Sequence, residues 1–271
     1  MKKPDYFLFI FFFILTIFSC SEDPILPPPN IIYILADDLG YGDLGVYNEE
    51  GKIKTPHLDQ MANEGMVFMD AHTSSSVCTP TRYGILTGRY NWRSPIKKGV
   101  LTGTSNGLIP QKRTTVGSFL KFKGYHTAFI GKWHLGWNWA LRDSSFVKTP
   151  IKDSEIFDKI DFSKNITNSP NDNGFDYAYG HCGSLDMPPY VYVENEKITA
   201  LVKKITGKNG NYHFWREGPT ADDFEHERVT PHLFDKAEAY ISKMSEKEKL
   251  FQTQERNNQA RKGDNLWQSK R

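Results

Sequence analysis

The chain alternates between short apolar runs and segments whose apolar residues recur at helical spacing. Residues 30–36 and 125–130 are apolar runs that each end in a polar cluster, and residues 66–68 form a shorter one. Continuous runs of this length are typical of parallel strands that are buried on both faces. We therefore expect strands over 30–36, 66–68 and 125–130.

Helices are predicted between and after these strands. The first is capped by Thr55, has Pro56 at its first position and ends at Gly65. Another is capped by Thr114 and runs to Gly124, and a third spans 231–242. This rhythm of strand, helix and strand predicts an α/β fold with a doubly wound, mostly parallel sheet.

Two stretches depart from this rhythm. The pattern loosens over 140–173, which we interpret as a polar surface insertion near the site. Residues 250–271 stay polar where a further apolar strand is expected after the last helix. We therefore expect an incomplete α/β domain over 30–249, apparently truncated, followed by an aberrant or disordered tail over 250–271.

The first 29 residues predict export. A basic start and an apolar stretch too short to cross a bilayer indicate a signal peptide over 1–19, and Cys20 lies where a lipoprotein is acylated. The proline-rich segment 20–29 then reads as a tether to a lipid anchor in the cell envelope, facing the periplasm or the cell surface. An ordinary cleaved signal peptide is the alternative.

Composition adds two exclusions. The formal net charge is +2 and falls by one when residues 1–19 are removed, so charge gives no argument for nucleic-acid binding. Three cysteines leave little room for a disulfide framework. We expect contact with a membrane only through the lipid anchor.

The segment Cys78-Thr79-Pro80-Thr81-Arg82 carries the strongest chemical signal. Pro80 suits a first helical position and Gly88 suits the residue past a helix end, so a short helix is predicted over 81–87. Cys78 then lies just before a helix N-terminus, where an anion is favoured. By itself the pattern is also compatible with a cysteine in a turn and an arginine on a solvated face.

Two further clusters lie at predicted strand ends. Asp37 and Asp38 follow the run 30–36, at the edge where open α/β sheets bind their ligands. Their hard oxygens suit Ca²⁺ or Mg²⁺, although such a pair is also common in turns and helix caps. The run 125–130 is followed by Gly131-Lys132-Trp133-His134-Leu135-Gly136. The Lys and the His in this string are each also compatible with a surface charge or a core side chain.

Three motifs in this order resemble those of one family, the formylglycine-dependent, arylsulfatase-like sulfatases of the alkaline phosphatase superfamily. They are the stretch after Asp37-Asp38, the string C-T-P-T-R with the following L-T-G-R, and G-K-W-H-L-G. The resemblance covers about residues 30–242. It implies an alkaline-phosphatase-like fold and hydrolysis of sulfate monoesters, a sulfuric ester hydrolase. The stretch Ser184–Tyr190 resembles a loop of sulfatases that act on sulfated sugars, which implies sulfated glycans as substrates.

The resemblance also implies residue roles. Cys78 is converted to formylglycine by a maturation enzyme and supplies the nucleophile. Arg82 braces it, Lys132 neutralises a sulfate oxygen, and His134 accepts a hydrogen bond or acts as a base. A divalent metal, Ca²⁺ or else Mg²⁺, is held by Asp37, Asp38 and the modified Cys78.

Two alternatives remain open at this point. Some phosphate and phosphonate monoester hydrolases of the same superfamily share the pattern C-x-P-x-R. The chain could also be an inactive, truncated remnant of a sulfatase lipoprotein.

Overall fold

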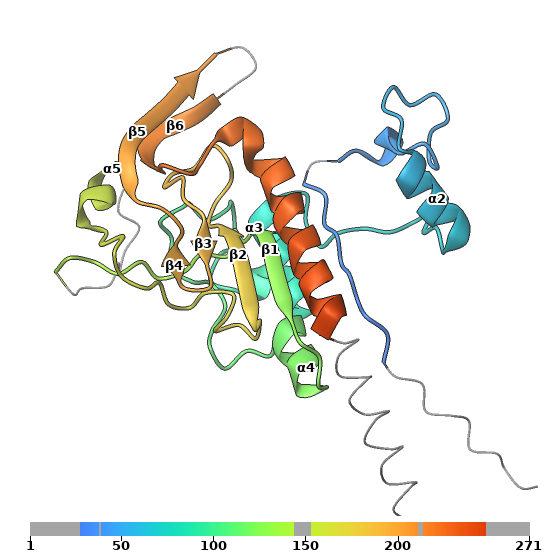
Figure 1. The fold of residues 1–271 in the computed structure, drawn as a ribbon, viewed down its shortest axis with the longest axis horizontal. Helices are drawn as coiled ribbons and strands as arrows, with labels where there is room; N and C mark the ends of the chain where they lie inside the picture. Colours follow the sequence, from blue (N-terminus) through green and yellow to red (C-terminus); the bar gives the residue numbers. More distant parts are fainter. Residues whose placement is uncertain (1–27, 38, 144–152, 211–213, 248–271) are drawn as a thin grey trace, which may run out of the picture. The chain divides into compact units, whose positions relative to one another are not determined.

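The chain divides into two compact units, residues 1–67 and residues 68–271 (Figure 1). The computed structural model describes residues 28–37, 39–143, 153–210 and 214–247. The predicted signal peptide, Cys20, Asp38 and the tail 250–271 lie outside the described residues.

The first unit contains the short 3-10 turn η1 (Tyr41–Asp43) and helix α2 (Pro56–Glu64). The prediction for α2 is confirmed at both ends, with Thr55 before the first turn and Gly65 after the last. The Thr55 hydroxyl does not cap the helix. It accepts a hydrogen bond from Gly45 N at 2.9 Å and donates to Asp59 at 3.0 Å, which fastens the preceding loop to α2.

The predicted strand over 30–36 was wrong for this structure. None of the described residues from 28 to 37 belongs to a strand, and the side chains of Ile31, Ile32, Tyr33 and Ile34 are between 57% and 68% exposed. Residues 66–68 are not in a strand either. An apolar run becomes a strand only where another strand completes its hydrogen bonds, and sequence pattern cannot supply that partner.

The second unit is built on a four-stranded sheet. Its strands are β1 (Ala128–Lys132), β2 (Tyr177–His181), β3 (Val193–Glu194) and β4 (Lys197–Ile198), in that order. The ladder between β1 and β2 is parallel, whereas β3 and β4 pair antiparallel. The fold is therefore mixed α/β. In the described part of this sheet the ladders are not mostly parallel, because a tight turn with Asn195 at φ 58° reverses the chain between β3 and β4.

Strand β1 lies later in the sequence than the predicted strand over 125–130. Pairing runs from Ala128 opposite Tyr177 to Lys132 opposite His181. At the residue before it, Thr127, the N–H donates to the side-chain Oδ2 of Asp176 at 3.0 Å. The shift places Lys132 inside the strand rather than after it.

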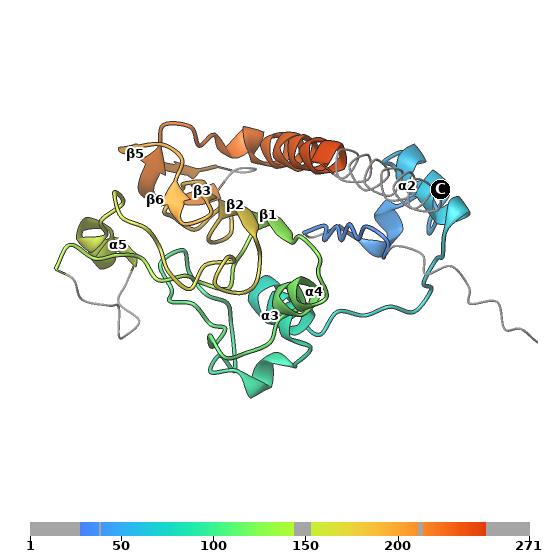
Figure 2. The same cartoon turned by 60° about the horizontal axis from the view of Figure 1, so that its bottom comes forward.

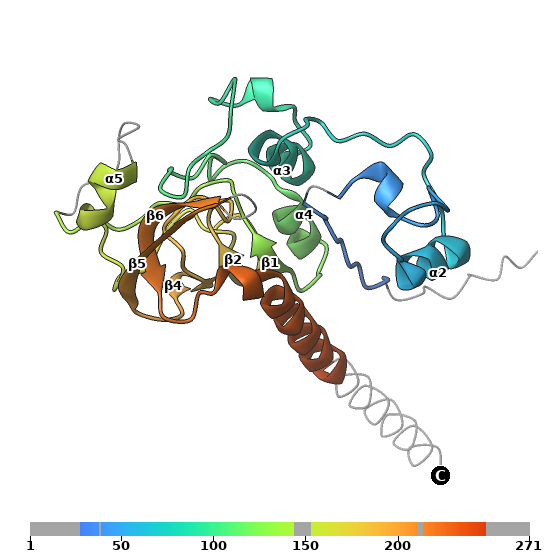
Figure 3. The same cartoon turned by 90° about the horizontal axis from the view of Figure 1, so that it is seen from above.

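Helices cover both faces of this sheet. Helices α3 (Cys78–Thr87) and α4 (Val116–Phe122) lie on one side, and the helix over 229–247 lies on the other (Figures 2 and 3). The cap of α4 is Thr115, one residue later than predicted. Further elements of the unit are α5 (Asp153–Ile156), the hairpin β5 (Val202–Asn209) and β6 (Phe214–Ala221), and the 3-10 turns η2 (Asn91–Arg93), η3 (Phe157–Lys159) and η4 (His226–Arg228).

The described parts of the segment 140–173, residues 140–143 and 153–173, are not the polar surface insertion that composition predicted. Ile156, Ile160 and Ile166 are buried to 1% exposure or less, and Leu141 forms a β-bridge with Ile160. Among the described residues of this segment, Leu141, Ile156, Ile160 and Ile166 belong to the core, and Phe157 and Phe162 pack against it. Sparse apolar residues can therefore anchor a loop whose average composition is polar.

Two hydrophobic clusters hold the second unit together. The larger surrounds Trp133, Leu135 and Trp137, and the smaller joins Tyr179 and Tyr192 to residues around the start of the helix over 229–247. None of the helices in the described ranges has both the length and the apolar character to cross a bilayer.

Candidate active site

Helix α3 carries the first cluster of predicted site residues. The helix begins at Cys78 itself, with Val77 as its N-cap, two residues earlier than Pro80, the predicted first position. Gly88 ends it in the left-handed conformation with φ 63°, as its sequence position indicated. Cys78 is partly buried in the first turn, where unpaired backbone N–H groups favour a negative charge.

Thr79 joins this helix to the segment that follows β1. Its buried hydroxyl donates to the carbonyl of His134 at 2.9 Å and accepts from Leu101 N at 3.2 Å. The imidazole of His134 in turn bonds through Nε2 to the carbonyl of Leu101 at 2.8 Å. Three segments that are distant in sequence are thus fixed around one buried hydroxyl.

Arg82 makes a second connection one turn further along α3. Its guanidinium Nη1 donates to the carbonyl of Lys132 at 2.5 Å. The structure therefore brings the Cys78–Arg82 segment together with the Lys132–His134 segment. Four predicted catalytic residues, Cys78, Arg82, Lys132 and His134, lie on two elements that are bonded to each other.

His134 has an unusual backbone. Its φ is 50°, its side chain is fully buried, and its N–H donates to the carbonyl of Cys182 at 2.7 Å. A left-handed conformation in a residue other than glycine is sustained only where surrounding bonds enforce it, and such positions concentrate at functional sites.

His181 was missed by the sequence analysis. It lies opposite Lys132 in the parallel ladder, is 5% exposed, and its carbonyl accepts from Trp133 N at 3.0 Å. Burial, and then the nearby charge of Lys132, lower the pKa of His181 to about 3, so its imidazole is neutral. The available signal was its place at the end of an apolar strand beside the strand that carries Lys132.

The predicted metal ligands cannot be assembled into a described site. Asp37 belongs to the first unit, Cys78 belongs to the second, and Asp38 lies outside the described residues. Among the residues that the structure describes, no group of three His, Cys, Asp or Glu side chains could hold a metal ion. The metal site stays a prediction.

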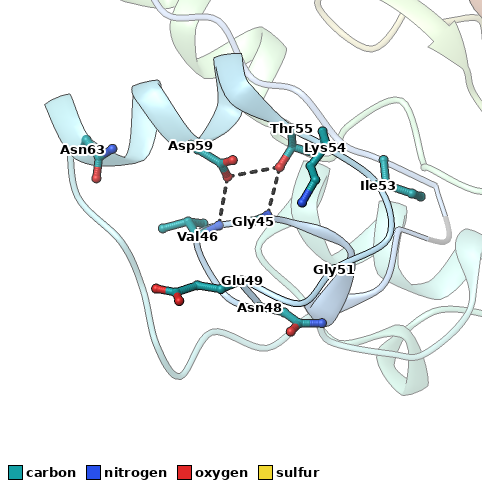
Figure 4. A pocket seen from close by; sticks show the side chains of 10 residues that line it. All are labelled: Gly45, Val46, Asn48, Glu49, Gly51, Ile53, Lys54, Thr55, Asp59 and Asn63. Carbon is teal, nitrogen blue, oxygen red and sulfur yellow. Dashed lines mark hydrogen bonds between the residues drawn. The ribbon is translucent and has the colours of Figure 1, made fainter.

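A hollow of about 300 Å³ lies in the first unit and contains none of the predicted site residues. Figure 4 shows how its polar groups are used: Val46 N donates to Asp59 at 2.8 Å, and Thr55 joins Gly45 to the same carboxylate. These side chains hold a loop to helix α2, which is a structural role.

The stretch Ser184–Tyr190 follows β2 and is held in place at two points. Arg216 of β6 donates to the Asp186 carboxylate at 2.6 Å, and the Tyr190 hydroxyl donates to the carbonyl of Arg216 at 2.7 Å. Between these two points, a Cβ on Gly103 would come within 2.1 Å of the carbonyl oxygen of Pro188. This close approach requires a residue without a side chain at position 103.

The structure is that of a mixed α/β protein in which two predicted motifs, one on α3 and one at the carboxyl end of β1, are bonded to each other. A family model for sulfatases matches residues 29–253. The chain belongs to the sulfatase family.

Relatives extend this match. The chain is 39% identical to the N-acetylgalactosamine-6-O-sulfatase of Bacteroides thetaiotaomicron over 64% of its own length and 30% of that protein. It is 38% identical to mouse arylsulfatase G, over 67% of the chain and 30% of the relative. The chain thus spans about a third of the length of these curated relatives.

A solved structure from work on the metabolism of multiple glycosaminoglycans by Bacteroides thetaiotaomicron matches with a TM-score of 0.63 and 31% identity. The match covers 79% of this chain and 48% of that one.

Proposed function

We propose that the protein hydrolyses sulfate monoesters of glycans at a site centred on Cys78. The observation that carries this proposal is the bonding of α3 to the segment after β1, from Thr79 to His134 and from Arg82 to Lys132. These bonds hold the two motifs of the sulfatase family in one place. The match to a family of sulfate ester hydrolases does not favour the alternatives of a phosphate hydrolase or an inactive remnant.

The residues divide the chemistry among them. Cys78, converted to formylglycine by a maturation enzyme, would supply the attacking hydroxyl at the start of α3, where the helix dipole favours negative charge. Arg82 would brace the formylglycine, and Lys132 would supply positive charge toward a sulfate oxygen, which becomes more negative as the ester bond breaks. His134 would hold or accept a proton.

A divalent metal completes the proposed site. Asp37 and Asp38 would hold Ca²⁺ or Mg²⁺, which would add positive charge at the sulfate. We also infer that the complete sheet is doubly wound, and that the protein is exported by residues 1–19 and anchored through Cys20. Helices on both faces of the sheet support the doubly wound arrangement.

Sulfated glycans are the proposed substrate class for two reasons. The bacterial relative is named as acting on an N-acetylgalactosamine 6-O-sulfate, and the structural neighbour comes from work on glycosaminoglycans. In this chain, the stretch Ser184–Tyr190 leaves β2 just after His181, and Arg216 fixes the Asp186 carboxylate on it. A fixed carboxylate is suited to accept hydrogen bonds from sugar hydroxyls.

Comparative turnover of p-nitrophenyl sulfate and p-nitrophenyl phosphate tests the proposed reaction. The matured protein is expected to prefer the sulfate, and Lys132→Met is expected to lower kcat/KM by about 10²-fold or more, as for loss of one transition-state charge contact. Lys123→Met, which removes an exposed lysine outside the site, is the matched control. A preference for the phosphate ester would show that the reaction is assigned wrongly.

A further inference from the structure

Positive charge is concentrated in one part of the chain. Residues 71–142 contain eleven Lys and Arg residues and no Asp or Glu, although the whole chain carries 34 basic and 32 acidic residues. A segment with many basic and no acidic side chains attracts polyanions. Four of the eleven cations lie within ten residues, directly after α3: Arg89, Arg93, Lys97 and Lys98.

These four cations are available to a ligand. In the described part of the chain, none of them forms an ion pair with a carboxylate, whereas Lys121 of the same basic stretch pairs with Asp176 at 2.6 Å. Arg89 is partly exposed and the other three are exposed. The absence of nearby acids leaves their charge uncompensated within the unit.

Two aromatic rings stand among these cations. Tyr90 and Trp92 stack with their centroids 4.1 Å apart and their planes 10° from parallel, yet they are 53% and 56% exposed. The ammonium group of Lys97 donates to the carbonyl of Trp92, so a cation lies on the same turn. Exposed flat rings beside cations suit a ligand that has both apolar faces and anionic groups.

The segment is held in a defined shape. The 3-10 turn η2 is closed by Arg93 N donating to the carbonyl of Tyr90 at 3.1 Å, and Ser94 after it is buried. Further along, Leu101 N bonds to Thr79 beside Cys78. The backbone that carries Tyr90 and Trp92 is therefore held in a defined turn, which lowers the entropic cost of binding.

We propose that Arg89–Lys98 is a binding surface for a sulfated polysaccharide, with Tyr90 and Trp92 against a sugar ring and the four cations on sulfate groups. A pyranose ring presents C–H faces that pack on aromatic rings, and arginine suits oxyanions because its planar donors bind two oxygens at once. The inference deepens the proposed function, because it names a polymeric ligand for the same protein, but its test measures binding rather than turnover.

The probes are chondroitin sulfate and chemically desulfated chondroitin, titrated into the purified protein by calorimetry at several NaCl concentrations. We expect the sulfated polymer to bind about tenfold more tightly or better, with a strong salt dependence. The double variant Tyr90→Ala/Trp92→Ala should lose about tenfold in affinity with its salt dependence unchanged. Lys97→Gln/Lys98→Gln should lose affinity and reduce the salt slope by about two.

The matched control is Lys112→Gln/Lys123→Gln, which removes two exposed lysines elsewhere in the same basic stretch. It should leave affinity within about twofold of the parent. If it weakens binding as much as the Lys97/Lys98 pair, or if the aromatic variant binds normally, the surface is assigned wrongly. Equal or tighter binding of single-stranded DNA or of phosphatidylserine vesicles overturns the choice of ligand, as does failure to bind chondroitin sulfate at low salt.

Folding and catalysis are separated from binding by two checks. Circular dichroism and melting of each variant are compared with the parent, and Trp92→Gln alone replaces the aromatic double variant if that variant is unfolded. Turnover of p-nitrophenyl sulfate, which is too small to span the surface, should be unchanged by Tyr90→Ala/Trp92→Ala. Loss of polymer binding with normal turnover supports this inference, whereas absent turnover with normal binding rejects only the proposed function.

Discussion

At the scale of single residues, the site depends on polar groups that are buried and bonded. Thr79 and His134 are both fully buried, and the bonds between them and Leu101 form a closed triangle. The threonine itself was not a predicted site residue. Its hydroxyl positions the helix that carries Cys78 against the segment that carries Lys132.

The first prediction concerns this hydroxyl. Thr79→Val keeps the shape of the side chain but removes its bonds to His134 and Leu101, so the free energy of unfolding should fall by about 1–3 kcal/mol. Urea denaturation measures the change, and Thr79→Ser, which retains the hydroxyl, should lose less. A valine variant as stable as the parent would show that these bonds contribute nothing net.

The second prediction concerns His181 and acid stability. Its pKa is lowered from its ordinary value near 6.5 to about 3 in the folded state, so the unfolded chain binds the extra proton between those values. Protonation of His181 in the unfolded chain therefore leaves the free energy of unfolding unchanged above pH 6.5. Between pH 6.5 and pH 3 it lowers that free energy by at most about 1.4 kcal/mol per pH unit. The free energy of unfolding, measured at pH 7, 6, 5 and 4, should fall less steeply with decreasing pH in His181→Asn than in the parent. The same pH dependence in both proteins would contradict the burial argument.

At the scale of elements, helix α3 is the part of the site most fully specified by its own sequence. Pro80 and Gly88 indicated a short helix near Cys78, and the structure differs only by starting it at Cys78. Gly88 is left-handed with open space around its Cα, so backbone conformation alone requires glycine there.

The third prediction follows from that conformation. Gly88→Ala should destabilise the protein by about 1 kcal/mol, because an L side chain disfavours the left-handed region. Gly88→Asn should lose less, since asparagine enters that region more readily. Thermal melting compares the three proteins, and equal melting temperatures for alanine and glycine at this position would refute the assignment.

Elements whose sequence signal is local agree with their predictions, whereas elements that depend on a partner strand differ from them. Helix α2 carries its own start and stop residues, and α3 and Lys132-Trp133-His134 are recognisable motifs. The run 30–36 carries no such local start and stop signal, because a strand forms only beside another strand that completes its hydrogen bonds. Two features depend on tertiary structure that no single-segment pattern contains. One is the register that sets His181 opposite Lys132, and the other is the burial of Ile156, Ile160 and Ile166.

At the scale of the whole molecule, the second unit unites the proposed catalytic residues with the basic, aromatic surface over residues 89–98. Both are attached to α3: Cys78 and Arg82 lie within the helix, and the surface begins one residue after Gly88. The proposed nucleophile and the surface therefore lie at opposite ends of the same helix, Cys78 at its start and Arg89 just after its end. The family match covers both segments.

Sulfate release that depends on Cys78 is the most direct test of the central claim. The protein is co-expressed with a formylglycine-generating enzyme, conversion of Cys78 is verified by peptide mass spectrometry, and free sulfate is measured from an N-acetylgalactosamine 6-sulfate substrate with Ca²⁺ present. The account predicts an aldehyde at Cys78 and sulfate release that Cys78→Ala abolishes. A confirmed aldehyde without sulfate release, or equal release by the alanine variant, would contradict it.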